Sequence, residues 1–266
     1  MSGRQGDRKS VLYDAADGVA VLRINRPEAR NSLGDGTEIE VYNTLLQASR
    51  DPSVRVLILR GEGDDFCCGA DIKQCNSNRT ESAQPLEGDT SFFKTPVLLH
   101  TMPAITIAAV KGGCAGAGFG WAAACDLRFA APSAKFNTAF LAVGAAGDMG
   151  VPWMLARQVG AARARDLSFF PRKFGADEAL AMGFISRILP ENAFEADLAR
   201  LAGELAAAAP LALKALKANY LDSERLDFAT FVEAETERHL ALFATEDRAE
   251  AFAAYLEKRP PRFVGR

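Results

Sequence analysis

The segment Phe66-Cys67-Cys68-Gly69-Ala70-Asp71-Ile72-Lys73 follows the run Val54 to Leu59, which is apolar on both faces and typical of a buried strand. Its small residues allow backbone N–H groups to approach a ligand closely. We therefore expect a binding loop directly after this strand.

A second junction of the same kind runs from Lys111 to Gly120, after a strand expected at Ile105 to Val110 and before a helix through Trp121 to Cys125. The amide donors at a helix N-terminus are unsatisfied and electropositive, so this junction can bind an anion or a developing oxyanion. One donor from each loop would form an oxyanion hole. Taken alone, the Gly/Ala segment favours tight helix packing over anion binding, because its glycines do not follow the G-x-G-x-x-G pattern and small residues often mark close helix contacts.

The surrounding pattern places these loops in an α/β core. Further strands are expected at Val19 to Ile24, Leu127 to Ala131 and Ile185 to Leu189. Between the first of them and the buried strand lies a helix that Asp35 can cap. The apolar stripe of that helix consists of Ile39, Tyr42, Leu45 and Leu46.

The C-terminal part of the chain has helical periodicity from Ala193 onward. Strands with interleaved helices come first and helices come last, which predicts an α/β core followed by a helical region. We place the core at residues 1–195 and the C-terminal helical region at residues 196–266.

Composition argues against several classes of function. The 266 residues include 31 Lys plus Arg and 34 Asp plus Glu, and the formal charge of −3 provides no broad footprint for nucleic acid or an anionic membrane. Five cysteines without metal-binding spacing and only two histidines argue against a disulfide framework and a metal site.

The polar start has no signal-peptide core, and the longest uncharged run, Gly112 to Cys125, is too short to span a bilayer. A cytoplasmic protein is therefore expected. The polar stretch Gln74 to Thr90 predicts a mobile surface loop.

Several motifs resemble one known family. Phe66 to Lys73 resembles the F-x-x-G-A-D-I-K segment of the crotonase (enoyl-CoA hydratase/isomerase) family. Arg26 to Leu33 is similar to its R-P-x-x-x-N-A-L loop, and Lys258 to Phe263 is similar to its K-R-x-P-x-F tail. The resemblance implies a repeated ββα spiral core, a helical C-terminal trimerisation region, and a homotrimer often stacked into a homohexamer. It also implies acyl-CoA thioesters as substrates, so that coenzyme A enters as part of the substrate and no separate cofactor is needed.

The resemblance also assigns roles to residues. By this likeness, the amides of Ala70 and Ala117 bind the thioester oxygen. The positions matched to CoA or substrate contacts are Ala29, Arg30, Cys68, Asp71, Ile72, Lys258 and Phe263.

The chain departs from the family pattern at two positions. Hydratases of this family carry two catalytic glutamates, and the matching places here hold Gly120 and Phe140. Hydration requires one group to activate water and another to manage the proton at the neighbouring carbon. Ordinary enoyl-CoA hydration is therefore disfavoured.

The remaining candidate acid is Asp148, which lies among small apolar residues, where desolvation should raise its pKa. The alternative is a structural role, as the cap of a helix that begins near Pro152 or as a stabiliser of a glycine turn. The local sequence resembles the 1,2-epoxyphenylacetyl-CoA isomerase branch, in which an aspartate on this loop is the base. It also resembles the 4-chlorobenzoyl-CoA dehalogenase branch, in which the aspartate is a nucleophile, although that branch has tryptophan at the place of Phe140.

These observations favour an enoyl-CoA isomerase that uses Asp148 and two backbone amides. The alternatives are an aryl- or acyl-CoA dehalogenase-like or hydrolase-like enzyme, an enoyl-CoA hydratase, and a catalytically inert CoA-binding protein. The acyl group stays open between fatty-acid and aromatic-acid substrates.

Overall fold

A six-stranded sheet forms the centre of the computed structural model, which describes residues 9–77 and 89–266. The strand order is β1-β2-β3-β4-β6-β9. The first two strands form an antiparallel hairpin, and every other neighbouring pair is parallel. The strands are β1 (Val11–Ala16), β2 (Val19–Ile24), β3 (Val56–Gly61), β4 (Ile105–Val110), β6 (Leu127–Ala130) and β9 (Arg187–Ile188).

A second, three-stranded sheet has the order β5-β7-β8 and consists of short strands. These are β5 (Gly113–Ala115), β7 (Lys135–Asn137) and β8 (Phe174–Gly175). After β4 the chain forms β5 and then helix α4 (Ala117–Ala124), and after β6 it again continues into the small sheet through β7. The chain therefore repeats a long strand, a short strand and a helical segment, as expected for a ββα spiral.

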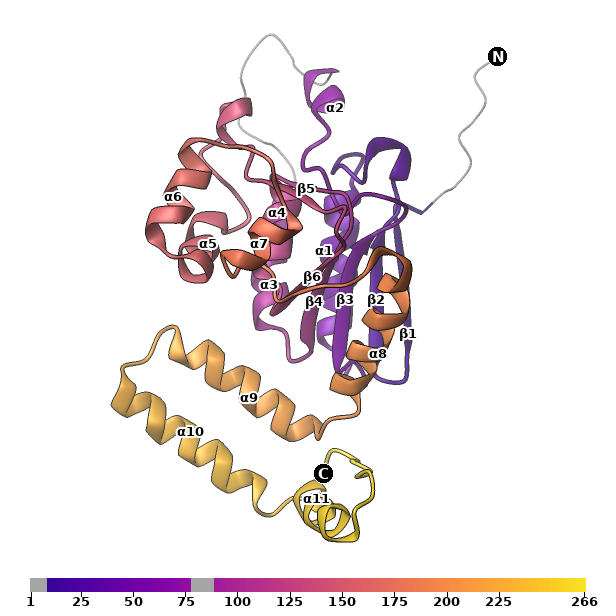
Figure 1. Cartoon of the computed structure of the whole chain (residues 1–266), viewed down its shortest axis with the longest axis vertical. Helices are drawn as coiled ribbons and strands as arrows, with labels where there is room; N and C mark the ends of the chain where they lie inside the picture. Colours follow the sequence, from indigo (N-terminus) through magenta and orange to yellow (C-terminus); the bar gives the residue numbers. More distant parts are fainter. Residues whose placement is uncertain (1–8, 78–88) are drawn as a thin grey trace.

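Helices cover both faces of the large sheet (Figure 1). On one face α8 (Phe194–Ala206) packs on alternate strand residues that include Ile58, Ile107 and Phe129. The other face packs against α1 (Thr37–Ser49), α3 (Thr95–Thr101) and α4. Because successive strand residues point to opposite faces, strands buried on both sides are almost continuously apolar. This explains why β3 and β4 are recognisable from sequence alone.

Helix α4 is buried along its whole length. The Phe119 ring stacks on Phe184 with centroids 4.6 Å apart, and it contacts Phe136 and Phe174 edge-on. Aromatic pairs of this kind resist sliding, because each ring occupies a shaped site. The N-terminus of α4, which carries Ala117, is therefore held in a fixed place.

The remaining helices lie around and below this core (Figure 1). The middle of the chain forms α2 (Ile72–Ser77), α5 (Val151–Val159), α6 (Ala161–Phe169) and α7 (Ala176–Ala181). The C-terminal region continues from α8 into α9 (Pro210–Ser223), α10 (Phe228–Leu242) and α11 (Glu246–Glu257). Short 3-10 turns lie at Pro27–Ala29, Ser91–Lys94, Leu141–Val143 and Glu191–Ala193. Within residues 9–77 and 89–266, no helix combines the length and apolar character that crossing a membrane requires.

Several local expectations need correction. Asp35 does not cap α1, since the N-cap is Gly36 and the Asp35 carboxylate instead pairs with Arg26. The buried face of α1 consists of Thr37, Val41, Leu45 and Ala48, so the stripe proposed from Ile39, Tyr42, Leu45 and Leu46 is correct only at Leu45. The expected loop at 74–90 begins inside α2, and its residues 78–88 lie outside the described residues.

Candidate active site

The two predicted loops run side by side at the carboxyl ends of β3 and β4. Three backbone hydrogen bonds join them: Phe66 N to Lys111 O (2.9 Å), Cys67 N to Gly113 O (3.0 Å) and Ala115 N to Cys67 O (2.9 Å). This arrangement is a short parallel ladder, which continues the strand pairing beyond the end of the large sheet. The ladder sets the register of one loop against the other.

Two glycines meet where this ladder ends. A Cβ built on Gly69 would lie 3.0 Å from Ala115 O and 3.5 Å from Gly116 Cα, so a side chain would separate the loops. Both glycines have positive φ, 87° at Gly69 and 53° at Gly116, which L-residues rarely adopt. The close approach places the next residues, Ala70 and Ala117, on adjoining loops.

The amides of Ala70 and Ala117 donate no hydrogen bond to any part of the chain that the structure describes. Ala117 is the first residue of α4, so its amide is one of the unsatisfied donors of a helix N-terminus. Two free donors on adjoining loops, one of them at the positive end of a helix, can stabilise an oxyanion.

A third loop joins these two. Leu33 N donates to Gly69 O (2.8 Å) and Asp71 N donates to Leu33 O (2.8 Å), so Leu33 and Ala70 form a parallel bridge. The buried Asn31 side chain donates to Glu62 O (2.9 Å) and Asp65 O (2.6 Å). The segment that resembles R-P-x-x-x-N-A-L therefore lies against the segment that resembles F-x-x-G-A-D-I-K.

Five of the predicted CoA-contact residues lie on or directly after these joined loops: Ala29, Arg30, Cys68, Asp71 and Ile72, the last of which begins α2. Ile72 is 56% exposed and available for contact, and Cys68 N donates to Arg30 O (3.3 Å). The Asp71 carboxylate is engaged by the Arg26 guanidinium (3.3 Å) and its amide by Leu33 O, so neither group is free to face a ligand.

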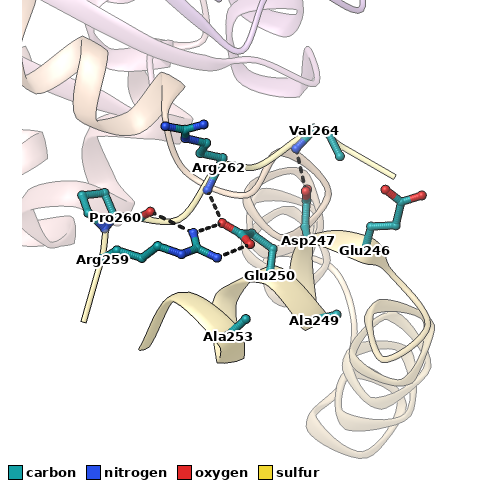
Figure 2. Close-up of a pocket in the computed structure, with 9 residues that line it drawn as sticks. All are labelled: Glu246, Asp247, Ala249, Glu250, Ala253, Arg259, Pro260, Arg262 and Val264. Carbon is teal, nitrogen blue, oxygen red and sulfur yellow. Dashed lines mark hydrogen bonds and ion pairs between the residues drawn. The ribbon is translucent and has the colours of Figure 1, made fainter. Parts of the chain in front are cut away.

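Lys258 and Phe263 lie elsewhere in the chain. The tail after α11 folds back on that helix, where Glu250 accepts from the Arg259 guanidinium and from Arg262 N (2.7 Å) (Figure 2). Asp247 accepts from the amides of Val264 (2.6 Å) and Gly265 (2.9 Å). The clamped tail therefore holds Lys258 and Phe263 beside α11.

This tail lies at the opposite end of the large sheet from the loops (Figure 1). Helix α9 attaches at the amino end of β4, because Lys217 Nζ donates to Ala104 O (2.8 Å). Strand β4 has six residues and therefore spans about 20 Å. Within one chain, Lys258 and Phe263 are thus not brought together with Ala70 and Ala117.

Asp148 lies on the loop between the 3-10 turn Leu141–Val143 and α5. Its Oδ1 atom is buried and has no hydrogen-bond partner among the described residues. Burial raises the pKa of the Asp148 carboxyl above its ordinary value. The capping alternative is wrong, because the N-cap of α5 is Gly150 and no side chain caps this helix.

The residue after Asp148 packs against α4. A Cβ built on Gly120 would lie only 2.5 Å from Met149 Cβ, so the Asp148 loop fills the space beside Gly120. Gly120 is three residues after Ala117, a rise of about 4.5 Å along the helix. This contact brings the Asp148 loop within about one helical turn of the Ala117 amide.

Comparison with known proteins agrees with this geometry. The sequence profile of the family described as enoyl-CoA hydratase/isomerase matches residues 14–266. The chain belongs to this family. It is 32% identical to 1,2-epoxyphenylacetyl-CoA isomerase of Escherichia coli, over 96% of this chain and 98% of that protein. It is 30% identical to crotonyl-CoA hydratase of Syntrophomonas wolfei, over 97% of this chain and 99% of that protein.

Solved structures of the family have the same fold. The enoyl-CoA hydratase of Bacillus anthracis superposes with a TM-score of 0.89 at 28% identity, covering 97% of this chain and all of that one. The predicted crotonase fold is therefore confirmed, as is membership of a family that acts on acyl-CoA substrates. Relatives named as hydratases and as isomerases both occur, so the names alone do not choose the reaction.

Two polar residues near the loops escaped the sequence analysis. Asp65 immediately precedes the recognised segment, and its carboxylate bonds to Arg30 and to Gly113 N. Lys173 is close enough to influence the Cys68 thiol: burial and the Asp65 charge raise the pKa of this thiol, while Arg30 and Lys173 oppose the rise. Neither residue carries a local sequence signal, because each acts through partners distant along the chain.

Proposed function

We propose that this member of the family is an acyl-CoA isomerase that moves a proton with a single carboxylate. Asp148 removes an allylic or α proton, and the amides of Ala70 and Ala117 stabilise the enolate oxygen that forms. The same carboxylic acid then returns the proton to another carbon on the same face. The observation that carries the proposal is the buried Asp148 Oδ1, which has no partner among the described residues and lies on a loop packed against α4.

Two features of the site support one acid rather than two. Gly120 and Phe140 stand where the family resemblance expects glutamates, and both positions are buried. The place of a side chain at Gly120 is already filled by Met149. A second carboxylate at this position would displace the loop that carries Asp148, so isomerisation with one acid fits the site better than hydration.

The raised pKa of Asp148 suits a carboxyl group that both removes and returns a proton. An acid that gains and releases a proton in one cycle is most effective when its pKa approaches the working pH. Desolvation moves the pKa of Asp148 in that direction. The Asp148 Oδ1 atom also has no hydrogen-bond partner among the described residues. A substrate C–H group or electrophilic carbon can therefore approach this oxygen without displacing a donor.

The variant Asp148→Asn tests the proposal, since it keeps the side-chain size and removes proton transfer. Turnover would be screened on 3-enoyl, 2-enoyl, aryl and ring-epoxide CoA thioesters. We expect isomerisation and solvent deuterium incorporation to fall by at least about 10²-fold, with acyl-CoA affinity within a few fold of wild type. Isomerisation that survives in Asp148→Asn would refute the one-carboxylate mechanism.

A nucleophilic Asp148 is the second candidate, favoured by the same partnerless oxygen. An aryl-halide or hydrolysable acyl-CoA would then leave an aspartyl adduct, which mass spectrometry would detect in wild type and not in Asp148→Asn. Oxygen from labelled water would enter Asp148 during turnover. Net hydration of a 2-enoyl-CoA would support the hydratase alternative, and binding of every thioester without turnover would support an inert CoA-binding protein.

We further propose that the protein works as a homotrimer or homohexamer in which the CoA end of each site is completed by a neighbouring copy. Within one copy, the loops and the Lys258–Phe263 tail lie at opposite ends of the large sheet. The family resemblance nevertheless assigns both to CoA contact. A tail that reaches the loops of an adjacent copy would reconcile these two observations.

A further inference from the structure

The Asp65 carboxylate lies where the three loops of the candidate site meet. Asp65 Oδ1 accepts from Gly113 N at 2.6 Å, on the loop that leads to Ala117. The same carboxylate accepts from Arg30 Nη2 (2.8 Å) and Arg30 Nε (2.8 Å), on the loop that resembles R-P-x-x-x-N-A-L. Asp65 itself immediately precedes the segment Phe66 to Lys73, which carries Ala70.

The hydrogen bond from Gly113 N to Asp65 lies at the start of the ladder, where it affects how the two loops are aligned. The hydrogen bonds between Phe66–Cys67 and Lys111–Ala115 begin at the residue after Asp65. They end two residues before Gly69 on one loop and one residue before Gly116 on the other. Gly113 N is the donor at the start of β5, and no strand partner is available to it other than the Asp65 side chain in the described structure. The carboxylate therefore completes the first rung of the ladder with a side-chain oxygen.

The space between the Asp65 carboxylate and Gly113 is too small for a longer side chain at position 65. Its side chain is 16% exposed, and a Cβ built on Gly113 would lie 2.9 Å from Asp65 Oδ1. A longer or bulkier group would push Gly113 away. Because Ala117 follows Gly113 by four residues, such a displacement would be passed to the amide at the N-terminus of α4.

We infer that Asp65 is a positioning residue: its carboxylate aligns the Ala117 amide with the Ala70 amide by fixing Gly113 N, and it holds Arg30 against the same loop. The inference rests on the oxyanion hole of the proposed function. It extends that function by naming the group that sets the spacing of the two donors. Asp65 does not touch the reacting atoms and acts only through the loops.

Two conservative variants separate geometry from charge. Asp65→Asn keeps an oxygen acceptor at the position that faces Gly113 N but removes the negative charge. Asp65→Glu keeps the charge but moves the carboxylate by one methylene. The matched control is Asp64→Glu, the same change at the neighbouring aspartate, which is exposed and makes no side-chain hydrogen bond that the structure describes.

The readout is polarisation of a bound thioester, which a merely structural role would not change. Cinnamoyl-CoA is the probe, because its conjugated absorption band moves to longer wavelength when two donors polarise the carbonyl. We expect wild type, Asp64→Glu and Asp65→Asn to show the shift, and Asp65→Glu to lose most of it. For the substrate turned over by wild type, kcat in Asp65→Glu should fall about tenfold to hundredfold, the loss typical of a misplaced group or donor.

The opposite pattern would overturn the inference. If Asp65→Glu keeps the band shift and kcat while Asp65→Asn loses them, the charge of Asp65 matters and its placement of Gly113 does not. If the absorption shift of cinnamoyl-CoA and kcat are both unchanged in Asp65→Asn and in Asp65→Glu, Asp65 does not position the two amides. If wild type binds cinnamoyl-CoA without any shift, the oxyanion hole of the proposed function is itself wrong, which is a different result from failure at Asp65 alone.

Discussion

At the scale of single residues, the candidate chemistry depends on small side chains as much as on the acid. Gly69 and Gly116 contact each other and allow the amides of Ala70 and Ala117 to lie on adjoining loops. Ala117 is almost fully buried, so a larger side chain there has little space. Substitutions that add atoms should therefore damage this site more than substitutions that remove them.

We expect Ala117→Val to lower kcat by about hundredfold, because the branched side chain obstructs the approach to its own amide and one oxyanion donor is lost. Cys114→Ala, on the same loop, only shortens a buried side chain and should have a much smaller effect. Steady-state kinetics on the best substrate would measure both. Near-normal turnover in Ala117→Val would place the oxyanion hole on a different loop.

Asp148 should also affect stability in a pH-dependent way. Its pKa is raised by burial, so the folded protein binds this proton more tightly than the unfolded chain does. The ionised carboxylate therefore destabilises the fold above the raised pKa, and the penalty disappears once the pH falls below the unfolded value of about 3.9.

Asp148→Asn should consequently melt at a higher temperature than wild type near neutral pH, although it is inactive. The difference should shrink as the pH falls through the raised pKa. Thermal melts across this range, with exposed Asp64→Asn as the control for loss of one negative charge, would measure the effect. A mutant that melts below wild type at neutral pH would indicate that Asp148 has a stabilising partner.

At the scale of elements, α9 is joined to the core by a buried ion pair. Lys217 Nζ lies 2.7 Å from Asp126 Oδ2, and its side chain is 4% exposed. The same carboxylate oxygen accepts from the backbone and the hydroxyl of Thr106 at the start of β4. Asp126 thus joins the large sheet to the C-terminal helices.

Lys217→Met should lower the free energy of unfolding by about 1–3 kcal/mol, because the partly buried Asp126 carboxylate loses its cation and keeps only its two hydrogen bonds from Thr106. Lys214→Met is the matched control, since Lys214 is exposed one turn earlier on α9. Urea unfolding followed by far-UV circular dichroism would give both values. Equal stability of the two variants would show that apolar contacts alone attach α9.

At the scale of the whole molecule, the C-terminal helices carry large apolar side chains that no other part of the described chain covers. Exposed apolar side chains on α9, α10 and α11 include Tyr220, Phe228, Leu240, Phe252, Tyr255 and Leu256. Tyr255 and Leu256 are 83% and 80% exposed. So many large apolar side chains left exposed on three helices are typical of an interaction surface, which fits the proposed assembly.

Light scattering at micromolar concentration should therefore give a mass that is a multiple of three chains. The double variant Tyr255→Glu with Leu256→Glu places two charges on this surface, and we expect it to dissociate and to bind CoA more weakly. Analytical ultracentrifugation and calorimetry would measure the two effects. A monomeric wild type with full activity would contradict both the assembly and a site shared between copies.

The sequence by itself determined the elements and motifs that depend on neighbouring residues. Strands β2 and β4 were placed at their observed bounds, and β3 was displaced by two residues, because apolar runs and turn residues carry their own signal. The two loops and Asp148 were found by composition and by resemblance. The short strands β5, β7 and β8 were missed, since two or three residues provide no periodicity.

Only the tertiary structure decided how these parts meet. The contacts of Asp65 join residues 35 and 48 positions apart, and Met149 occupies the place of a side chain at Gly120. The tail after α11 lies at the opposite end of the large sheet from the loops. Local sequence encodes backbone preference and the face that a residue presents. Contacts between distant loops follow from the packing of the whole core, and no local pattern of residues specifies them.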